Sequence, residues 1–292
     1  MEQAAQPKPL THLTKFVPLR SICLSLDDVK AIYDRLALIV DEQADAEIGA
    51  LVKPENKSDD EWAEYIKAAR ENAFKIITTI AGRDGSSLMG ADASVFSAAN
   101  RPDKISSIFM SNVAAYENFA RVKPVNNFSV NLDFTKPLLL EWGTPLSAPT
   151  SNASNVSVEG NRDGWVASVH AAVSAVVDQR RVNRNWLHRA FGYDFGLFLL
   201  GLPFALYLCW KTSGMIQRGL GSLHQIVAAA AYVYLFFFAL FIYRGLFGYA
   251  KWAFPTMELS NNKDSASSHR VVMGAVMLGI VVDVLWELRN VL

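Results

Sequence analysis

The chain has 292 residues, 51% of them hydrophobic, and a formal net charge of +0. Because nucleic-acid binding normally requires a basic face, this balance predicts no nucleic-acid partner. The chain has only 2 cysteines, Cys23 and Cys209, so a disulfide framework is excluded. Residues 1–16 contain no apolar core of signal-peptide length, and we expect no cleaved secretion signal.

The N-terminal part of the chain reads as an arm followed by a helix. Residues 1–22 are polar and proline-containing, which predicts a flexible arm. An α+β domain is predicted over residues 23–185. Its first helix begins after Ser25, forms a capping box with Asp28, and ends near Ile48.

A second helix and a series of strands follow. Ser58 and Glu61 form a second capping box, which predicts a helix over Asp59–Glu71. The apolar residues then change to short runs rich in isoleucine, threonine and phenylalanine, as is typical of strands. The predicted strands are Ala73–Ala81, Ile105–Asn112, a third within Ala114–Val122, and Asn126–Phe134.

These strands are expected to form a small, mostly antiparallel sheet with the helices packed on one face. Within Asn126–Phe134 the apolar and polar residues alternate strictly, which predicts a strand buried on one side. A further strand over Asn155–Gly160 and a helix over about Gly164–Val182 should return to the same sheet. The loop that connects Asn126–Phe134 to Asn155–Gly160, residues 135–154, is long and rich in proline.

The segment 186–250 contains two apolar runs, 193–210 and 226–246, each close to the length that crosses a bilayer. The second run carries no charged side chain between Val227 and Ile242. A helix that is apolar on all sides favours lipid over a small protein core. We therefore predict a transmembrane helical hairpin, with a kink at Pro203 in its first helix.

Basic residues around the hairpin predict its orientation. Lys211 and Arg218 are the basic residues between the two runs, whereas more basic residues lie before and after them. The positive-inside rule then places the domain in the cytoplasm, at the inner membrane of the cell. The residues predicted to set this topology, and to attract anionic lipid head groups, are Arg180, Arg181, Arg184 and Arg189.

The C-terminal part, 251–292, is predicted to be a cytoplasmic loop followed by a membrane-associated helix. Its stretch 271–288 is apolar up to Val282 but then contains Asp283 and Glu287. Both a third span and a helix at the inner surface remain open for this stretch.

The sequence contains no phosphate-binding loop, hydrolase elbow, zinc motif or dinucleotide fingerprint, so we expect no cofactor and no metal. The favoured hypothesis is an integral membrane protein whose cytoplasmic α+β domain binds a partner or ligand. An alternative is an oligomeric pore or membrane-damaging effector gated by that domain. A third hypothesis is an enzyme using Asp84, Asp133 and His170, although turn, strand and surface positions explain these residues better. Expected partners are an anionic bilayer and either another protein or further copies of the chain.

Overall fold

The computed structural model describes residues 12–138, 149–221, 224–260 and 266–291. The chain forms two compact units. The first, here called the sheet unit, comprises 1–135, 152–182 and 257–265. The second, called the helical unit, comprises 136–151, 183–256 and 266–292. Each is described by itself.

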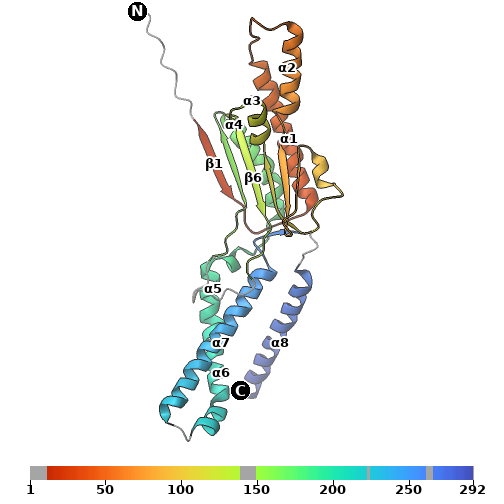
Figure 1. Ribbon diagram of the computed structural model, residues 1–292. Coiled ribbons are helices and arrows are strands. Elements are labelled where there is room, and N and C mark those ends of the chain that lie inside the picture. Colours follow the sequence, from red (N-terminus) through yellow and green to blue (C-terminus); the bar gives the residue numbers. More distant parts are fainter. Residues whose placement is uncertain (1–11, 139–148, 222–223, 261–265, 292) are drawn as a thin grey trace, which may run out of the picture. The chain divides into compact units, whose positions relative to one another are not determined.

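The sheet unit is built on a 6-stranded sheet with the order β1-β7-β6-β5-β3-β4. All neighbouring strands are antiparallel, as the sequence predicted (Figure 1). The strand–helix unit after residue 154 does return to this sheet, where its strand lies between the first strand and β6. The strands are β1 Leu13–Pro18, β3 Ile77–Gly82, β4 Ser87–Gly90, β5 Ile105–Ser111, β6 Asn127–Asp133 and β7 Asn155–Gly160.

Helices of the sheet unit pack on one face of this sheet (Figure 1). Both predicted capping boxes are present, at the starts of α1 and α2, where they satisfy backbone N–H groups that the helices leave unpaired. The helical segments are α1 Leu26–Gly49, α2 Asp59–Asn72, α3 Val113–Ala120 and α4 Asp163–Val177, with short 3-10 turns η1 Ala93–Phe96 and η2 Asp178–Arg180.

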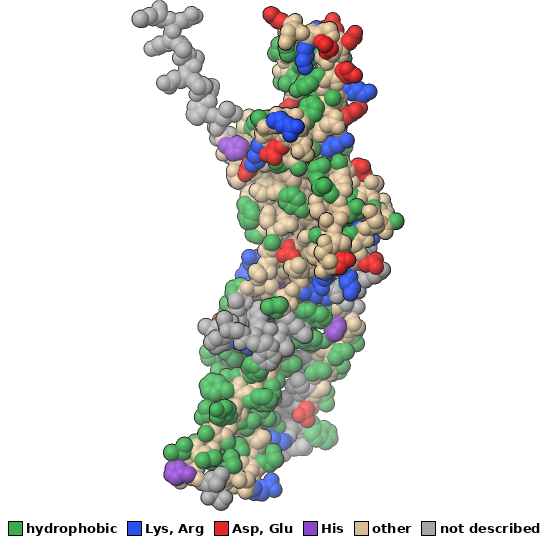
Figure 2. Space-filling view, in the orientation of Figure 1, with side chains coloured by type: hydrophobic (Ala, Val, Ile, Leu, Met, Phe, Trp, Pro, Cys, Tyr) green, Lys and Arg blue, Asp and Glu red, His purple; other side chains and the backbone are tan. Residues whose placement is uncertain are grey.

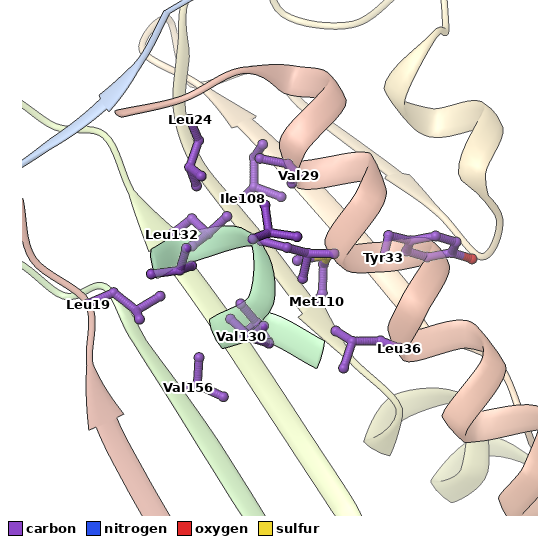
Figure 3. Packing of buried hydrophobic residues seen from close by; sticks show 14 of the residues in the cluster. Leu19, Leu24, Val29, Tyr33, Leu36, Ile108, Met110, Val130, Leu132 and Val156 are labelled. Carbon is purple, nitrogen blue, oxygen red and sulfur yellow. The ribbon is translucent and has the colours of Figure 1, made fainter. Parts of the chain in front are cut away.

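The core lies between the sheet and helices α1 and α4. Figure 3 shows Val29 and Leu36 of α1 close to Ile108 and Met110 of β5. Val130, Leu132 and Val156 continue the layer on the same face of the sheet, and all three are 2% exposed or less. The apolar residues at alternate positions of the strands therefore pack in one layer with the apolar residues that recur every three or four positions in α1.

A second, two-stranded sheet joins three distant parts of the chain. Strand β2 (Ile22–Leu24) pairs in parallel with β8 (Met257–Leu259), which follows the apolar segment in sequence. The Ser260 amide donates to the Leu24 carbonyl at 2.8 Å. On its other side β2 meets the chain just before the apolar segment, where the Val182 amide donates to the Ser21 carbonyl at 2.8 Å. Both ends of the apolar segment are thus bonded to the β2 region.

The structure differs from the sequence prediction at the N-terminus. Residues 13–18 and 22–24 are strands, whereas a flexible arm was expected over 1–22, of which 1–11 lie outside the described residues. β1 is an edge strand, and its Pro18 sits at the strand end, where a missing N–H breaks no pairing. Residues 13–18 are ordered by tertiary pairing with β7, which local composition does not reveal.

The predicted strand within Ala114–Val122 is wrong, because Val113–Ala120 is helix α3. Its aromatic residues follow helical spacing. Tyr116 packs edge-on against Phe74 at 5.6 Å between ring centroids, and Phe119 packs against Tyr65 at 5.8 Å. Two rings three residues apart can face neighbouring elements only in a helix.

The helical unit contains the two apolar segments. The first is continuous from residue 190 to 220 and has a π-helical turn in its middle, directly before Pro203. This widened turn accommodates the backbone change that a proline imposes, at the place where the sequence predicted a kink. The elements are η3 Asn185–His188, α5 Ala190–Gly196, η4 Leu197–Gly201, α6 Leu202–Leu220, α7 Gln225–Ala253 and α8 Ser267–Val291.

Helices α6 and α7 pack side by side. The Cys209 thiol donates to the Tyr232 carbonyl, and the Tyr243 hydroxyl donates to the Tyr193 carbonyl at 3.1 Å. A side chain at Gly201 would meet the Tyr243 ring at 3.1 Å, so glycine permits this close approach. Cys23 and Cys209 are not joined by a disulfide.

Two stretches of the described chain, Ala190–Leu220 and Gln225–Ala253, are long and apolar enough to cross a membrane. The most apolar 18-residue windows of these stretches have mean hydropathies of 1.5 and 2.3, and only 22% and 11% of those windows are buried. The core helices of a soluble protein would be mostly buried. Figure 2 shows apolar side chains covering the visible face of these helices.

Candidate functional site

The four arginines singled out in the sequence do not share one environment. Arg180 bonds to Asp28 through Nε at 3.0 Å and through a terminal nitrogen at 2.9 Å. Arg181 bonds to Asp178 at 2.9 Å. These two arginines belong to the sheet unit, and each already has a carboxylate partner.

Asp28 shows what Arg180 contributes to the sheet unit. Burial of this carboxylate raises its pKa, but hydrogen bonds from the Ser25 amide, the Ser25 hydroxyl and Arg180 outweigh burial, so the net pKa is lowered. Asp28 is thus held ionised at the start of α1. Arg180 ties the end of the α4 region to that helix, which is a structural role.

The other two arginines belong to the helical unit. Arg189 is exposed and precedes α5. Arg184 lies over the ring of Phe254, 5.7 Å from its centroid. Arg270 lies over the same ring at 5.1 Å, and its Nε donates to the Ala253 carbonyl at 2.8 Å. Phe254 therefore carries two guanidinium groups from segments far apart in sequence.

A buried histidine lies beside this ring. His188 is 4% exposed, and its Nε2 donates to the Phe254 carbonyl at 2.7 Å, because a carbonyl can only accept. Its Nδ1 is 2.9 Å from the Thr150 hydroxyl. Burial lowers the pKa of His188, the bond to Phe254 opposes this, and the positive charges of Lys251 and Arg184 lower the pKa further. The ring is therefore held neutral in a positive field.

Two lysines lie near aromatic rings of the last turns of α7. Lys251, in the last turn of α7, is 3% exposed, and its ammonium lies 5.6 Å from the ring centroid of Phe247. Lys136 lies 4.4 Å from the ring centroid of Trp252. Cations near the C-terminal end of a helix are favoured by its dipole. We call the four residues that contact these rings the boundary cations: Lys136, Arg184, Lys251 and Arg270.

Of this group, the sequence analysis placed only Arg184 among the residues predicted to attract head groups, whereas Lys251 and Arg270 were counted among the basic residues after the second run that predict its orientation. The other three cations lie in segments 48 to 86 residues away from Arg184 along the chain, by subtraction of residue numbers. A usable signal was present at 251–254, where a lysine and two aromatic rings follow the apolar run.

The side chains named for an enzyme hypothesis are not brought together by any described contact. Asp84 accepts from Ser86 within the β3–β4 turn, and Asp133 accepts from Thr135 and from the Ala153 amide. His170 lies on α4, with its nearest described polar partner being Ser174 at 3.5 Å. Among the described residues, no group of His, Cys, Asp or Glu is arranged to hold a metal ion.

The second candidate surface is the sheet face opposite α1 and α4, here called the open face. Many of its side chains are polar, and three large apolar ones are exposed: Phe16 is 63%, Met89 71% and Phe109 43% exposed. Ile77 lies on the same face and is partly buried. One row crosses all the strands in register. The row consists of Met89, Thr79, Phe109, Asn131, Asn155 and Pro18.

Comparison of the chain with protein-family models, with curated proteins and with solved structures found no match.

Proposed function

We propose that this chain is an integral membrane protein that holds a binding domain at one side of a bilayer. In this proposal α6 and α7 cross the bilayer as a hairpin, and the sheet unit binds a partner or ligand. The observation that carries it is the pairing around β2. Residues before α5 and after α7 both bond to this strand region, so an apolar segment that leaves the domain also returns to it.

The hairpin interpretation follows from this return. Two ends held on one small sheet lie on the same side of a membrane, and an even number of crossings connects them. The exposed apolar surface of α6 and α7 supports lipid as their surroundings, since water would penalise it. The excess of basic residues at the domain end supports a cytoplasmic sheet unit.

The open face is the surface that we propose for binding. Its three exposed large apolar side chains, Phe16, Met89 and Phe109, lie among polar ones. Such a mixed surface suits a partner that binds and dissociates.

A photo-crosslinking amino acid at Phe109 tests this function in intact membranes. We expect a discrete adduct from this position and none from the control position Leu38, an equally apolar residue of α1 that is 67% exposed. Adducts at neither position, or equally at both, would contradict a binding role for the open face. Ion conductance by the purified chain in liposomes would favour the pore hypothesis instead.

A further inference from the structure

The β1 edge of the sheet exposes backbone groups that can pair with a further strand. β1 is the first strand in the order of the sheet, and within the described residues it pairs only with β7. The Leu19 amide donates to the Ser154 carbonyl at 2.9 Å, in the same register as the β1–β7 pairs. Because hydrogen-bonded pairs alternate along antiparallel strands, the peptide groups of Thr14 and Phe16 point away from β7. Their N–H and C=O groups have no hydrogen-bond partner in the described part of the chain.

β1 is better suited to such pairing than the opposite edge of the sheet. It has 6 residues in uninterrupted register with β7, whereas β4 at the opposite edge has 4. Thr14, Lys15 and Phe16 are all exposed. Shortening or bulging an edge strand protects it from pairing, and β1 shows neither feature. A peptide that added a strand here would form backbone hydrogen bonds and contact the Phe16 ring.

Lys15 and Pro18 restrict which strand can pair with this edge. Pro18 has no N–H, so within β1 the outward backbone donors are those of Thr14 and Phe16. An antiparallel pairing between two copies that uses all of these donors places Thr14 opposite Phe16, and therefore Lys15 of one copy opposite Lys15 of the other. Like charges directly opposite one another destabilise a sheet. A second copy is thus disfavoured as the partner, whereas a carboxylate opposite Lys15 would be attracted to it.

The charge along this edge is positive. Residues 12–20 contain Lys15 and Arg20 and no acidic residue. Neither of these two cations forms an ion pair with another described residue. Glu159, on the neighbouring strand β7, lies 2.6 Å from the ammonium of Lys123, whose hydrogen bond lowers the pKa of this carboxyl. Glu159 is already bonded to Lys123, so the charge of the edge is open to an acidic partner.

We propose that β1 binds an extended peptide segment that has an acidic residue opposite Lys15 and an apolar residue opposite Phe16. The segment adds a strand to the sheet beside β1. Its acidic side chain lies on the covered side and its apolar side chain on the open face, because neighbouring residues of a strand point to opposite faces. This inference rests on the binding role proposed for the sheet unit, and it names the chemistry of the partner.

Selection from a displayed library of random short peptides, with the purified full chain in detergent as the target, tests this edge. We expect enriched peptides in which an acidic residue adjoins β-branched or aromatic residues. A synthetic copy of an enriched peptide should bind Thr14→Pro about fivefold or more weakly than it binds the parent, because this substitution removes one outward N–H. Proline is tolerated at such positions of edge strands, so the variant should fold. The matched control Thr14→Val keeps the donor and should bind as the parent does.

A charge reversal tests the same edge without a change in its backbone. Selection with Lys15→Glu should enrich basic peptides in place of acidic ones, because the cross-strand partner then faces a carboxylate. The matched control Lys67→Glu, at an exposed position of α2, should leave the selection unchanged.

Three results would overturn the proposal: no enriched peptide, equal binding to Thr14→Pro and Thr14→Val, or the same selection by Lys15→Glu as by the parent. A dimer of the full chain that Thr14→Pro disrupts would assign the edge to a second copy instead. The photo-crosslink at Phe109 separates these failures from failure of the proposed function. An adduct there together with any of these results removes the edge site only, whereas no adduct there contradicts the binding role of the open face.

Discussion

The two units use apolar side chains in opposite ways. In the sheet unit the large apolar residues of β5 and β6 other than Phe109 point to the covered face, and Phe128, Ile108 and Leu132 are 1% exposed or less. In the helical unit many large apolar residues are exposed, including Phe198 at 71% and Phe237 at 64%. This contrast is what the proposed membrane location predicts, with water around the sheet unit and lipid around the helical unit.

This difference shows why exposure alone does not identify a binding surface. Phe16 and Phe237 have nearly equal exposed fractions, 63% and 64%, but different neighbours. Phe16 lies beside polar residues on an edge strand, whereas Phe237 continues an apolar surface along α7. Substitutions that replace apolar residues at matched positions in the two units therefore test this difference.

The largest effect is expected in the core of the sheet unit. Phe128→Ala should lower the free energy of unfolding by about 3–5 kcal/mol, because it removes a ring that is 1% exposed and leaves a cavity. Phe109→Ala, on the open face of the neighbouring strand, should change it by about 1 kcal/mol or less. Pulse proteolysis of the full chain in denaturant measures both. Similar losses would mean that the faces of the sheet are misassigned.

A smaller effect is expected from a charged residue placed in α7, and it tests whether this helix lies in lipid. Phe237→Asp should cost about 2.5–3.5 kcal/mol of insertion free energy, because a carboxylate enters the middle of a spanning helix. Phe16→Asp should change stability by about 0.5 kcal/mol or less, as exposed positions in water usually do. The fraction of the chain that resists alkaline extraction from membranes reports the first change. Unaltered extraction in Phe237→Asp would indicate that α7 does not lie in lipid.

The smallest effect concerns Arg180. Its ion pair with Asp28 is partly exposed, so Arg180→Ala should cost about 1 kcal/mol or less near neutral pH. The folded-state pKa of Asp28 lies below its ordinary value of 3.8, so its contribution to stability is present above that value and is lost as pH falls through the folded pKa. Without Arg180 this loss should begin at a higher pH. Acid unfolding of the two proteins compares them, and identical profiles would contradict the structural role.

Local patterns in the sequence predicted much of the fold. The capping boxes of α1 and α2 and the alternation in β6 depend on residues within a few positions of one another, and all three are present in the structure. By contrast, β1 and β8 are short strands that exist because distant partners supply their hydrogen bonds. Helix α3 was mistaken for a strand because eight residues give little periodicity to distinguish the two.

The candidate site was predictable only in part for the same reason. Charge near a span end is visible in sequence, and this identified Arg184. The grouping of Arg184 with Arg270 depends on both reaching the ring of Phe254, which is a tertiary contact. In the sequence, Arg180 looks equivalent to Arg184. Its carboxylate partner Asp28 lies 152 residues away, so the pairing that distinguishes the two arginines is visible only in the structure.

Cysteine accessibility tests the central claim, that the apolar helices leave the sheet unit and return to it across a bilayer. Single cysteines are placed at Asn183, before α5, at Gln217, near the end of α6, and at Ser260, after β8, in a background without Cys23 and Cys209. In intact cells an impermeant maleimide should label the cysteine at Gln217. Those at Asn183 and Ser260 should react only after lysis. Different accessibility of Asn183 and Ser260, or equal accessibility of all three, would contradict the account.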